Sequence, residues 1–191
     1  TQTIQSFCER IVDVDPDLRQ MALFDLQEQL NHPEFSLTDA EQDKVVPHIL
    51  TAFSSREVNS EVHSQSVRML TTLVRKLSSK NRQRITDQLV KTLWDTIAET
   101  KNAEAIRTLR ENACMGLKAV VEGLSEDHKD TVQSMIPNLL AGLRSSESKI
   151  RTDIFDVLGE LVRNFGQVIV EKHAEIQEGA IANFNGDLGP R

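Results

Sequence analysis

Aromatic residues are scarce in this sequence, and tyrosine is absent altogether. Of the 191 residues, 4% are aromatic and 39% are hydrophobic in the wider sense, with alanine, leucine, valine, glutamate and glutamine plentiful. Aromatic side chains favour strands, whereas most of these abundant residues favour helices. The composition therefore predicts an all-α protein, and the chain is long enough to bury a sizeable core.

Cysteine, glycosylation motifs and long apolar runs are also scarce or missing. The two cysteines, Cys8 and Cys114, form no C-x-x-C pair and fall at apolar helical positions, so we expect buried free thiols. The sequence shows no secretory leader, no N-x-[ST] motif and no apolar run long enough to cross a bilayer. These absences favour a reducing compartment, and we expect a cytoplasmic and nuclear protein.

Catalytic and metal-binding signatures are missing as well. The sequence contains no G-x-S-x-G, G-x-x-x-x-G-K-[ST], G-x-G-x-x-G or H-E-x-x-H motif, and its five histidines are dispersed. Asp13, Asp15 and Asp17 alternate as in an EF-hand loop, but Leu18 and Phe24 stand where that loop needs Gly and Glu. We therefore expect turn and helix-capping roles for the aspartates, and no enzyme activity, cofactor or metal.

Positive charge is in deficit, since the net charge is −7. An acidic chain repels phosphate backbones and anionic lipids, which argues against nucleic acid or membrane as a partner. One basic cluster stands out, and its members are Arg75, Lys76, Lys80, Arg82 and Arg84. A nuclear-targeting or nucleic-acid patch is one interpretation. The lack of interleaved aromatics favours the other, a solvated loop or a contact with an acidic protein.

An apolar residue followed by Arg or His recurs four times, and each pair begins the same apolar pattern. The pairs are Leu18-Arg19, Val62-His63, Leu109-Arg110 and Ile150-Arg151. Positions +4, +8 and +12 from each apolar residue are Ala22, Leu26, Leu30; Ser66, Leu70, Val74; Ala113, Leu117, Val121; and Ile154, Leu158, Val162. These steps place the side chains on one face of a helix. The pairs lie 44, 47 and 41 residues apart, which is typical of two-helix HEAT-type repeats.

We therefore predict a right-handed α-solenoid of HEAT repeats, with about four and a half antiparallel helix pairs in one segment over residues 1–191. Each repeat has a helix A and a helix B, and helix B begins near the apolar-basic pair. The predicted repeats cover residues 3–31, 38–78, 81–124 and 126–166, with a partial repeat at 167–191. Because each repeat packs mainly on its neighbours, we expect function to reside in a surface rather than a pocket.

Two predicted A helices contain a proline. Pro47 and Pro137 fall inside helical segments, where proline removes a hydrogen bond and bends the axis. The alternative is that each proline begins a new helix. Thr38 and Glu41 have the spacing of a capping box at the start of the second repeat. Gly166 is predicted to end the fourth B helix in a left-handed conformation.

The third repeat departs from the regular spacing. Ile106-Arg107 lies 44 residues after Val62-His63, but only Leu109-Arg110 preserves the apolar pattern that follows. We therefore expect a short insertion in the turn at residues 101–104. The basic residues of the four pairs recur with the architecture, so intra-repeat hydrogen bonds or ion pairs are expected of them. Direct contact with a partner is the alternative.

The B-helix face opposite the apolar pattern is the candidate protein-binding surface, because B helices line the concave side of HEAT solenoids. Its residues are Phe24, Gln27, Glu28, Arg68, Thr72, Arg75, Met115, Lys118, Glu122, Asp156, Glu160 and Arg163. Phe24 and Met115 stand out, since exposed apolar residues among charges are typical of protein interfaces. The alternative is that both pack on a neighbouring repeat.

The partial repeat predicts a second surface. Residues 169–184 have the pattern of a fifth A helix, with Pro190-Arg191 where the next apolar-basic pair is expected. Ile176, Ile181 and Phe184 would then form an apolar face without its B helix, and solenoids need covered ends. We expect the remaining HEAT repeats, on the same polypeptide or on a separate chain, to cover this solenoid-continuation surface.

Two stretches of the sequence are specific enough to indicate a family resemblance. The first similar stretch is Asp17-Leu18-Arg19-Gln20-Met21-Ala22-Leu23-Phe24-Asp25-Leu26, followed by Lys44-Val45-Val46 and Ile49-Leu50. The second extends from Leu109-Arg110 through Gly116-Leu117-Lys118 to Val120-Val121. In their order and linker lengths, these stretches resemble the amino-terminal HEAT repeats of the cullin-associated, neddylation-dissociated (Cand) protein family, and the resemblance covers nearly the whole chain.

The resemblance implies a non-catalytic regulator that binds an unneddylated cullin and its RING subunit. Such a regulator exchanges substrate receptors on cullin-RING ubiquitin ligases, including SCF complexes, and its amino-terminal repeats hold the RING-bearing end of the cullin. A karyopherin-type or tubulin-binding HEAT adaptor is the alternative. Karyopherins place Trp on B helices, whereas Trp94 lies on a predicted A helix. Tubulin-binding HEAT modules use basic turns within their repeats, whereas the turns at 14–17 and 145–148 are not basic.

Overall fold

The computed structural model describes residues 2–54, 57, 59–98, 103–145 and 147–186, and these ranges contain helices and no strand. The α-helices are α1 (Gln2–Arg10), α2 (Pro16–Asn31), α3 (Asp39–Thr51), α4 (Ser60–Lys76), α5 (Ser79–Ala98), α6 (Ala103–Gly123), α7 (Lys129–Gly142), α8 (Ser148–Phe165) and α9 (His173–Gly186). Short 3-10 helices, η1 (Glu126–His128) and η2 (Val170–Lys172), precede α7 and α9. The predicted all-α class is confirmed.

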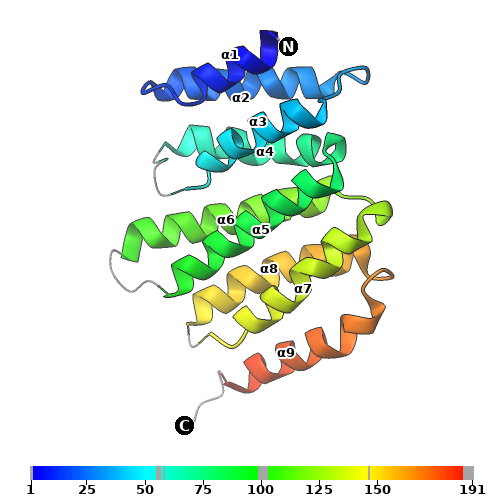
Figure 1. Ribbon diagram of the computed structural model, residues 1–191. Coiled ribbons are helices and arrows are strands. Elements are labelled where there is room, and N and C mark those ends of the chain that lie inside the picture. Colours follow the sequence, from blue (N-terminus) through cyan, green and yellow to red (C-terminus); the bar gives the residue numbers. More distant parts are fainter. Residues whose placement is uncertain (1, 55–56, 58, 99–102, 146, 187–191) are drawn as a thin grey trace.

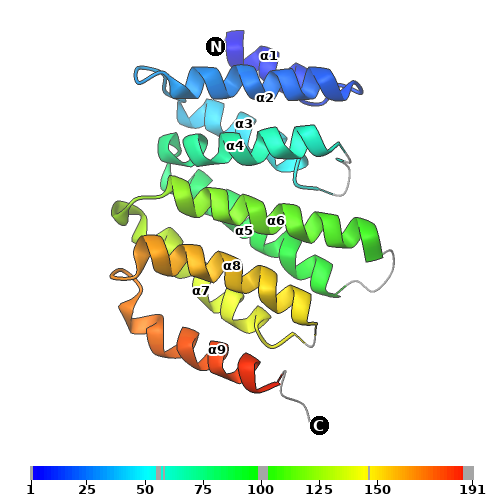
Figure 2. The same cartoon turned by 180° about the vertical axis from the view of Figure 1, so that it is seen from behind.

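The helices form two layers that extend along one axis from the N-terminal to the C-terminal end. Figure 1 shows the layer of A helices, α1, α3, α5, α7 and α9, toward the viewer. Figure 2 shows the layer of B helices, α2, α4, α6 and α8, from the opposite side. We call the outer surface of this second layer the B face. The stacked pairs make the molecule an all-α solenoid, as predicted.

Local sequence determines where the helices begin. The Asp15 carboxylate caps α2 by accepting a hydrogen bond from the Asp17 N–H, and Pro16 occupies the first turn, where its missing N–H costs nothing. Thr38 and Glu41 form the predicted capping box at the start of α3. The expected turn and capping roles of the aspartates are therefore confirmed at α2.

Pro47 and Pro137 both lie inside A helices. Pro47 is within α3 and Pro137 is within α7, so neither proline begins a new helix. Each therefore leaves one backbone carbonyl of the preceding turn without its helical partner. The prediction of prolines within two A helices is confirmed, and the alternative of helix starts is wrong.

The predicted apolar positions form the core side of the B helices. Most are buried, and even Ser66 is fully buried, with its hydroxyl donating to the Val62 carbonyl at 2.8 Å. Leu109 is half-buried, and the two outermost members, Leu18 and Val162, are 37% and 39% exposed. These two lie on α2 and α8, which each have a described B-helix neighbour on one side only. Burial thus depends on stacking as well as on position along the helix.

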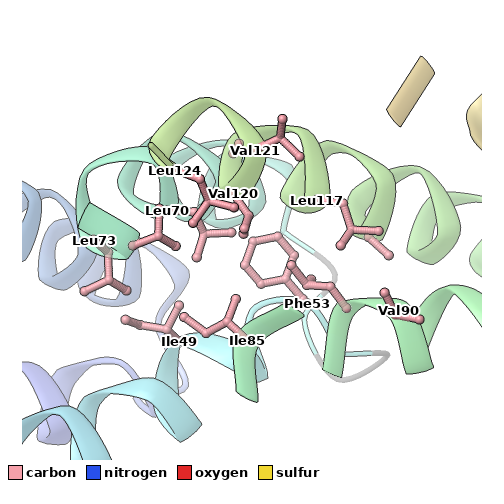
Figure 3. Packing of buried hydrophobic residues seen from close by; sticks show 14 of the residues in the cluster. Ile49, Phe53, Leu70, Leu73, Ile85, Val90, Leu117, Val120, Val121 and Leu124 are labelled. Carbon is pink, nitrogen blue, oxygen red and sulfur yellow. The ribbon is translucent and has the colours of Figure 1, made fainter. Parts of the chain in front are cut away.

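The centre of the core joins the second and third repeats. Figure 3 shows the Phe53 ring between buried side chains of α4, α5 and α6, among them Leu70, Ile85 and Leu117. Phe53 follows the end of α3, and its side chain is 2% exposed. A Cβ added at Gly116 would lie 3.0 Å from the Phe53 ring, so the ring packs directly on the α6 backbone.

Helix α6 has an additional turn at its N-terminal end. Arg19, His63 and Arg151 are each the fourth residue of their helices, whereas Arg110 is the eighth residue of α6. The additional residues include Ile106, which explains the misleading Ile106-Arg107 pair. The expectation of an insertion in the turn is therefore wrong for residues 103–104, because they belong to an additional helical turn that begins at Ala103. Residues 101–102 lie outside the described part.

Two glycines lie at the ends of B helices. Gly123 ends α6, but a Cβ there would lie 2.5 Å from the Thr71 carbonyl oxygen and 2.2 Å from Val74 Cγ2. Glycine therefore allows α6 to approach the α4 backbone closely. Gly166 has φ −50° and ψ −39°, which is a right-handed helical conformation, so the predicted left-handed cap is wrong. The chain continues from it into the turn before η2.

Candidate protein-binding surface

Arg19 joins the first repeat to the second. Its Nη1 donates to the carbonyls of Asp13 and Val14, in the turn before α2, at 2.8 and 3.0 Å. Its Nε and Nη2 donate to the Glu57 carboxylate at 2.8 and 2.9 Å. Burial acts to raise the pKa of Glu57, but hydrogen bonds from Arg19 and from the Asn59 N–H outweigh it and lower that pKa. The expected intra-repeat bonds are present, together with an inter-repeat ion pair.

His63 and Arg151 also bond to the turns that precede their helices. His63 Nε2 lies 3.1 Å from the Glu57 carbonyl oxygen, and Arg151 Nη1 donates to the Ser145 carbonyl at 2.9 Å. Arg110 differs because its additional helical turn displaces it from the start of α6. It pairs instead with Asp153 of α8, at 3.1 Å, so its expected intra-repeat bond is replaced by an inter-repeat one.

Two members of the basic cluster hold the solenoid together. Lys76 Nζ donates to the carbonyls of His32 and Phe35 at 2.9 and 2.7 Å, which fastens α4 to the loop after α2. Lys80 Nζ lies 2.9 Å from the Asp43 carboxylate, and its hydrogen bond lowers the pKa of Asp43. These cations are engaged by acceptors of the chain itself. The structure therefore favours an architectural role for this part of the cluster over a phosphate-binding patch.

A groove of about 600 Å³ lies on the B face between α4 and α6 and reaches α2. Six of the twelve predicted binding residues line it, and they are Gln27, Arg68, Thr72, Met115, Lys118 and Glu122. Val67, Thr71 and Ala119 complete the lining. The structure thus brings half of the predicted surface to one place.

Small side chains create this groove. Thr71, Thr72 and Ala119 fill little of the space between α4 and α6, and the close approach at Gly123 draws the helices together at one end. The longer side chains of Arg68 and Met115 then stand at the sides of the depression. Periodicity could place these residues on the B face, but the depth depends on side-chain size across two helices.

Polar contacts cross the B face at the edges of the groove. The Gln65 amide donates to the Gln27 side-chain oxygen at 2.5 Å, which joins α4 to α2. Arg75 Nη2 donates to the Glu122 carbonyl at 3.4 Å, which joins α4 to α6. Three of the predicted binding residues therefore also stabilise the stack of repeats.

The predicted residues of α8 lie outside the groove. Asp156 is 3.9 Å from Lys118 Nζ, and Glu160 is 2.5 Å from Arg163 Nη1. Both pairs have at least one largely exposed member, so water screens them and they contribute little stability. The predicted surface is consequently divided into a grooved part over α2 to α6 and an ion-paired part on α8.

Phe24 and Met115 are exposed, at 54% and 42%, so neighbouring repeats do not cover them. Three further apolar residues of the first repeat are exposed but were not predicted from the sequence. Val12 and Val14 in the turn after α1 are 60% and 95% exposed, and Met21 on α2 is 55% exposed. Met21 could have been found from helical periodicity, because it points away from the buried positions of α2.

The solenoid-continuation surface is described at two of its three predicted residues. Ile176 of α9 is half-buried and packs against the core, whereas Ile181 is 55% exposed. The side chain of Phe184 and the pair Pro190-Arg191 lie outside the described residues. Asn183 donates to the Leu143 carbonyl at 3.2 Å, which fastens α9 to the end of α7. Ile181 is therefore the described apolar contact that α9 offers to another element.

The two cysteines differ in burial. Cys114 is buried, and desolvation raises the pKa of its thiol to about 12. Cys8 is only half-buried, so the expectation of a buried thiol is wrong there, although burial still raises its pKa. Among the described residues, no three His, Cys, Asp or Glu side chains are grouped closely enough to hold a metal ion. None of the described helices is both long and apolar enough to span a membrane.

Comparison with known proteins agrees with this geometry. A model of HEAT-like repeats matches residues 107–161, which include most of α6, α7 and most of α8. The match agrees with the stacked helix pairs of an all-α solenoid, and residues 107–161 are similar to HEAT-like repeats.

The chain is also similar to two curated relatives. It is 26% identical over 187 residues to Cullin-associated NEDD8-dissociated protein 1 of Dictyostelium discoideum, which covers 93% of this chain and 14% of that protein. It is 25% identical over 177 residues to Cullin-associated NEDD8-dissociated protein 1 of Drosophila melanogaster, which covers 91% of this chain and 13% of that protein. The resemblance predicted from the sequence is confirmed, and the chain spans about a seventh of the length of these relatives.

Proposed function

We propose that this chain is a non-catalytic HEAT-repeat scaffold that binds unneddylated cullin-RING ubiquitin ligases. It would act as the amino-terminal part of a factor that exchanges substrate receptors on these ligases. The similarity to Cullin-associated NEDD8-dissociated protein 1 over more than nine-tenths of the chain carries the proposal. The partners are the cullin and its RING subunit, in the cytoplasm and nucleus, without nucleic acid or membrane.

The B face supports this proposal with a suitable surface. It presents Phe24 and Met115 uncovered beside charged residues, and an exposed apolar group with a polar rim is the usual composition of a protein interface. The groove between α4 and α6, which Met115 lines, adds concave area. We assign the twelve predicted residues to this contact, with the grooved part over α2 to α6 as its centre.

Further HEAT repeats, on the same polypeptide or on a separate chain, would cover α9. Ile181 supports this second contact because it is exposed on the last described helix. The curated relatives are several times longer than the matched region, which leaves ample length for more repeats. A chain of this extent would then supply part of the grip on the cullin rather than the whole exchange reaction.

Titration calorimetry with purified cullin-RING tests the proposal. We expect binding of the unneddylated complex and weaker binding of the neddylated one. Replacing Phe24 and Met115 together with Glu should lower the affinity at least about tenfold, because apolar anchors dominate interface energies. Val170→Glu is the matched control, since Val170 is equally exposed but lies in η2 outside the B face.

The cullin proposal fails if unneddylated cullin-RING binds neither this chain nor a longer chain that restores further repeats. The assignment of the B face fails separately if the Phe24, Met115 double variant and Val170→Glu bind cullin-RING equally well. Circular dichroism of each variant ensures that a loss of binding is not a loss of fold.

A further inference from the structure

The groove between α4 and α6 combines an apolar base with positive charge. Val67 is half-buried against the core and Ala119 is 4% exposed, so both lie low in the depression, while Met115 stands beside them at 42% exposure. Arg68 and Lys118 border the same space. A ligand in this groove would contact apolar side chains at its base and the cations of Arg68 and Lys118 beside them.

Arg68 differs from the other cations of the B face. Arg75 donates to the Glu122 carbonyl, and Lys118 has Asp156 within 3.9 Å. Arg68 is exposed and has neither a hydrogen-bond nor an ion-pair partner within the described ranges. An exposed guanidinium without such a partner can take a carboxylate in bidentate geometry without first breaking a contact.

The chain as a whole is strongly acidic, with a net charge of −7, and it therefore repels acidic segments at most places. The groove reverses this tendency locally, since the lining cations Arg68 and Lys118 outnumber the single acidic lining residue, Glu122. Beyond the lining, Arg75 and Asp156 add one charge of each sign. Charge complementarity consequently selects an acidic partner here and directs it to one place.

We propose that this groove binds an acidic amphipathic segment of the partner protein, in which apolar side chains are flanked by carboxylates. An apolar side chain packs on Val67, Ala119 and Met115, and a neighbouring carboxylate binds Arg68, with Lys118 as the second cation. The inference rests on the proposed function in one respect, that the B face is where the chain binds a protein. It adds the chemistry of the segment that the groove accepts.

Three synthetic peptides test this groove without a cullin. The first has leucines flanked by glutamates, the second has lysines in place of the glutamates, and the third has serines in place of the leucines. Chemical-shift changes of the nitrogen-15-labelled chain report binding, even when it is weak. We expect the first peptide alone to shift the amide signals of α4 and α6 around the groove.

Charge reversal supplies the matched variants. Arg68→Glu should weaken binding of the glutamate-leucine peptide at least about tenfold, as expected for loss of a charge-assisted pair and gain of a like charge. Arg84→Glu makes the same change on α5, in the other layer, and should leave binding unchanged. Met115→Ser should also weaken binding, because it removes an apolar contact but no charge.

The inference is overturned if the lysine peptide binds as well as the glutamate peptide, if Arg68→Glu and Arg84→Glu behave alike, or if no peptide shifts the groove signals. These outcomes are independent of the cullin measurement. Peptide binding without cullin-RING binding would keep the groove and reject the proposed function. If cullin-RING binds the Arg68→Glu variant as tightly as the wild type, and no peptide shifts the groove signals, the groove proposal alone is rejected.

Discussion

Arg110 and Asp153 form an ion pair in which both side chains are buried. Arg110 Nε lies 3.1 Å from Asp153 Oδ2, and the two side chains are 7% and 8% exposed. Lys149 reaches the other carboxylate oxygen at 2.9 Å, and this hydrogen bond raises the pKa of Lys149. The third and fourth repeats are therefore joined by a charged contact from which water is largely excluded.

Asp153→Ala should destabilise the chain by about 3 kcal/mol, because it leaves the buried Arg110 without its carboxylate. Arg110→Ala should cost less, since Lys149 still neutralises Asp153. Urea denaturation followed by circular dichroism measures both. The control is Asp95→Ala, which removes the exposed pair with Lys91 and should change the midpoint little. Equal effects of Asp153→Ala and Asp95→Ala would contradict the structural role of the buried pair.

Gly123→Ala and Gly159→Ala should shift stability in opposite directions. A Cβ at Gly123 meets the Thr71 carbonyl oxygen at 2.5 Å, and backbone cannot move aside easily, so we expect a loss of about 1–3 kcal/mol. A Cβ at Gly159, in the interior of α8, meets no atom within 4 Å, so the better helix propensity of Ala should add up to about 1 kcal/mol. Thermal unfolding of the two variants decides the sign of each effect.

The Arg19–Glu57 pair predicts a specific pH dependence. The folded state lowers the pKa of Glu57 below its ordinary value of 4.5, so the ionised carboxylate stabilises the fold. This contribution is complete above that value and is lost as the pH falls through the lower, folded-state pKa. Glu57→Gln should therefore reduce the free energy of unfolding at neutral pH, with a difference from wild type that shrinks in acid.

An Arg19→Met background provides the control for this pH dependence. Without the guanidinium, the Asn59 N–H and the nearby His63 still favour the ionised Glu57, but the largest stabilising contact is gone, so the effect of Glu57→Gln should be smaller. Denaturant titrations at several pH values measure the four proteins. A difference between wild type and Glu57→Gln that stays constant from neutral to acid pH would rule out this linkage.

Cys8 should react with iodoacetamide faster than Cys114 in the folded chain. The pKa of about 12 leaves almost no Cys114 thiolate at neutral pH, and its burial also blocks the reagent. Cys8 is half-buried, so its thiol is more accessible. Mass spectrometry of quenched samples locates the label, and denatured protein, in which both cysteines should react alike, serves as the reference.

Ile181→Asp should leave the isolated chain unaffected, because Ile181 is already exposed there. In a longer chain with further HEAT repeats, the same change should lower the hydrogen-exchange protection of α9 by placing a charge in an apolar contact. Ala182→Asp is a suitable neighbouring control, since Ala182 is also exposed. Similar protection of α9 in both variants would show that Ile181 is not part of the covered surface.

Much of the fold could be predicted because helical periodicity is a local property of the sequence. The buried positions from Val62 to Val74 and the capping box at Thr38 follow from spacing alone. The partners of the recurring arginines could not be predicted in this way. Glu57 and Asp153 lie 38 and 43 residues from the arginines that they bind, and no local pattern tells which acidic residue stacking brings near.

The candidate surface could likewise be predicted only in part from helical periodicity. The exposure of Phe24 and Met115 follows from their positions opposite the buried stripe. The groove depends on the combined size of Thr71, Thr72 and Ala119 on two helices, which periodicity does not describe. The close contact of Gly123 with Thr71 is likewise a matter of packing between helices.

The longer α6 shows how such an array can change its length. Its additional residues come before Arg110, at the free end of a helix, so every contact that follows keeps its register. Insertions of this kind are nearly neutral for the rest of the chain, whereas a similar insertion after Arg110 would rotate the apolar residues out of the core. The distance between repeats can therefore drift over evolution, and the basic residue that anchors each B helix is the better landmark for aligning distant sequences.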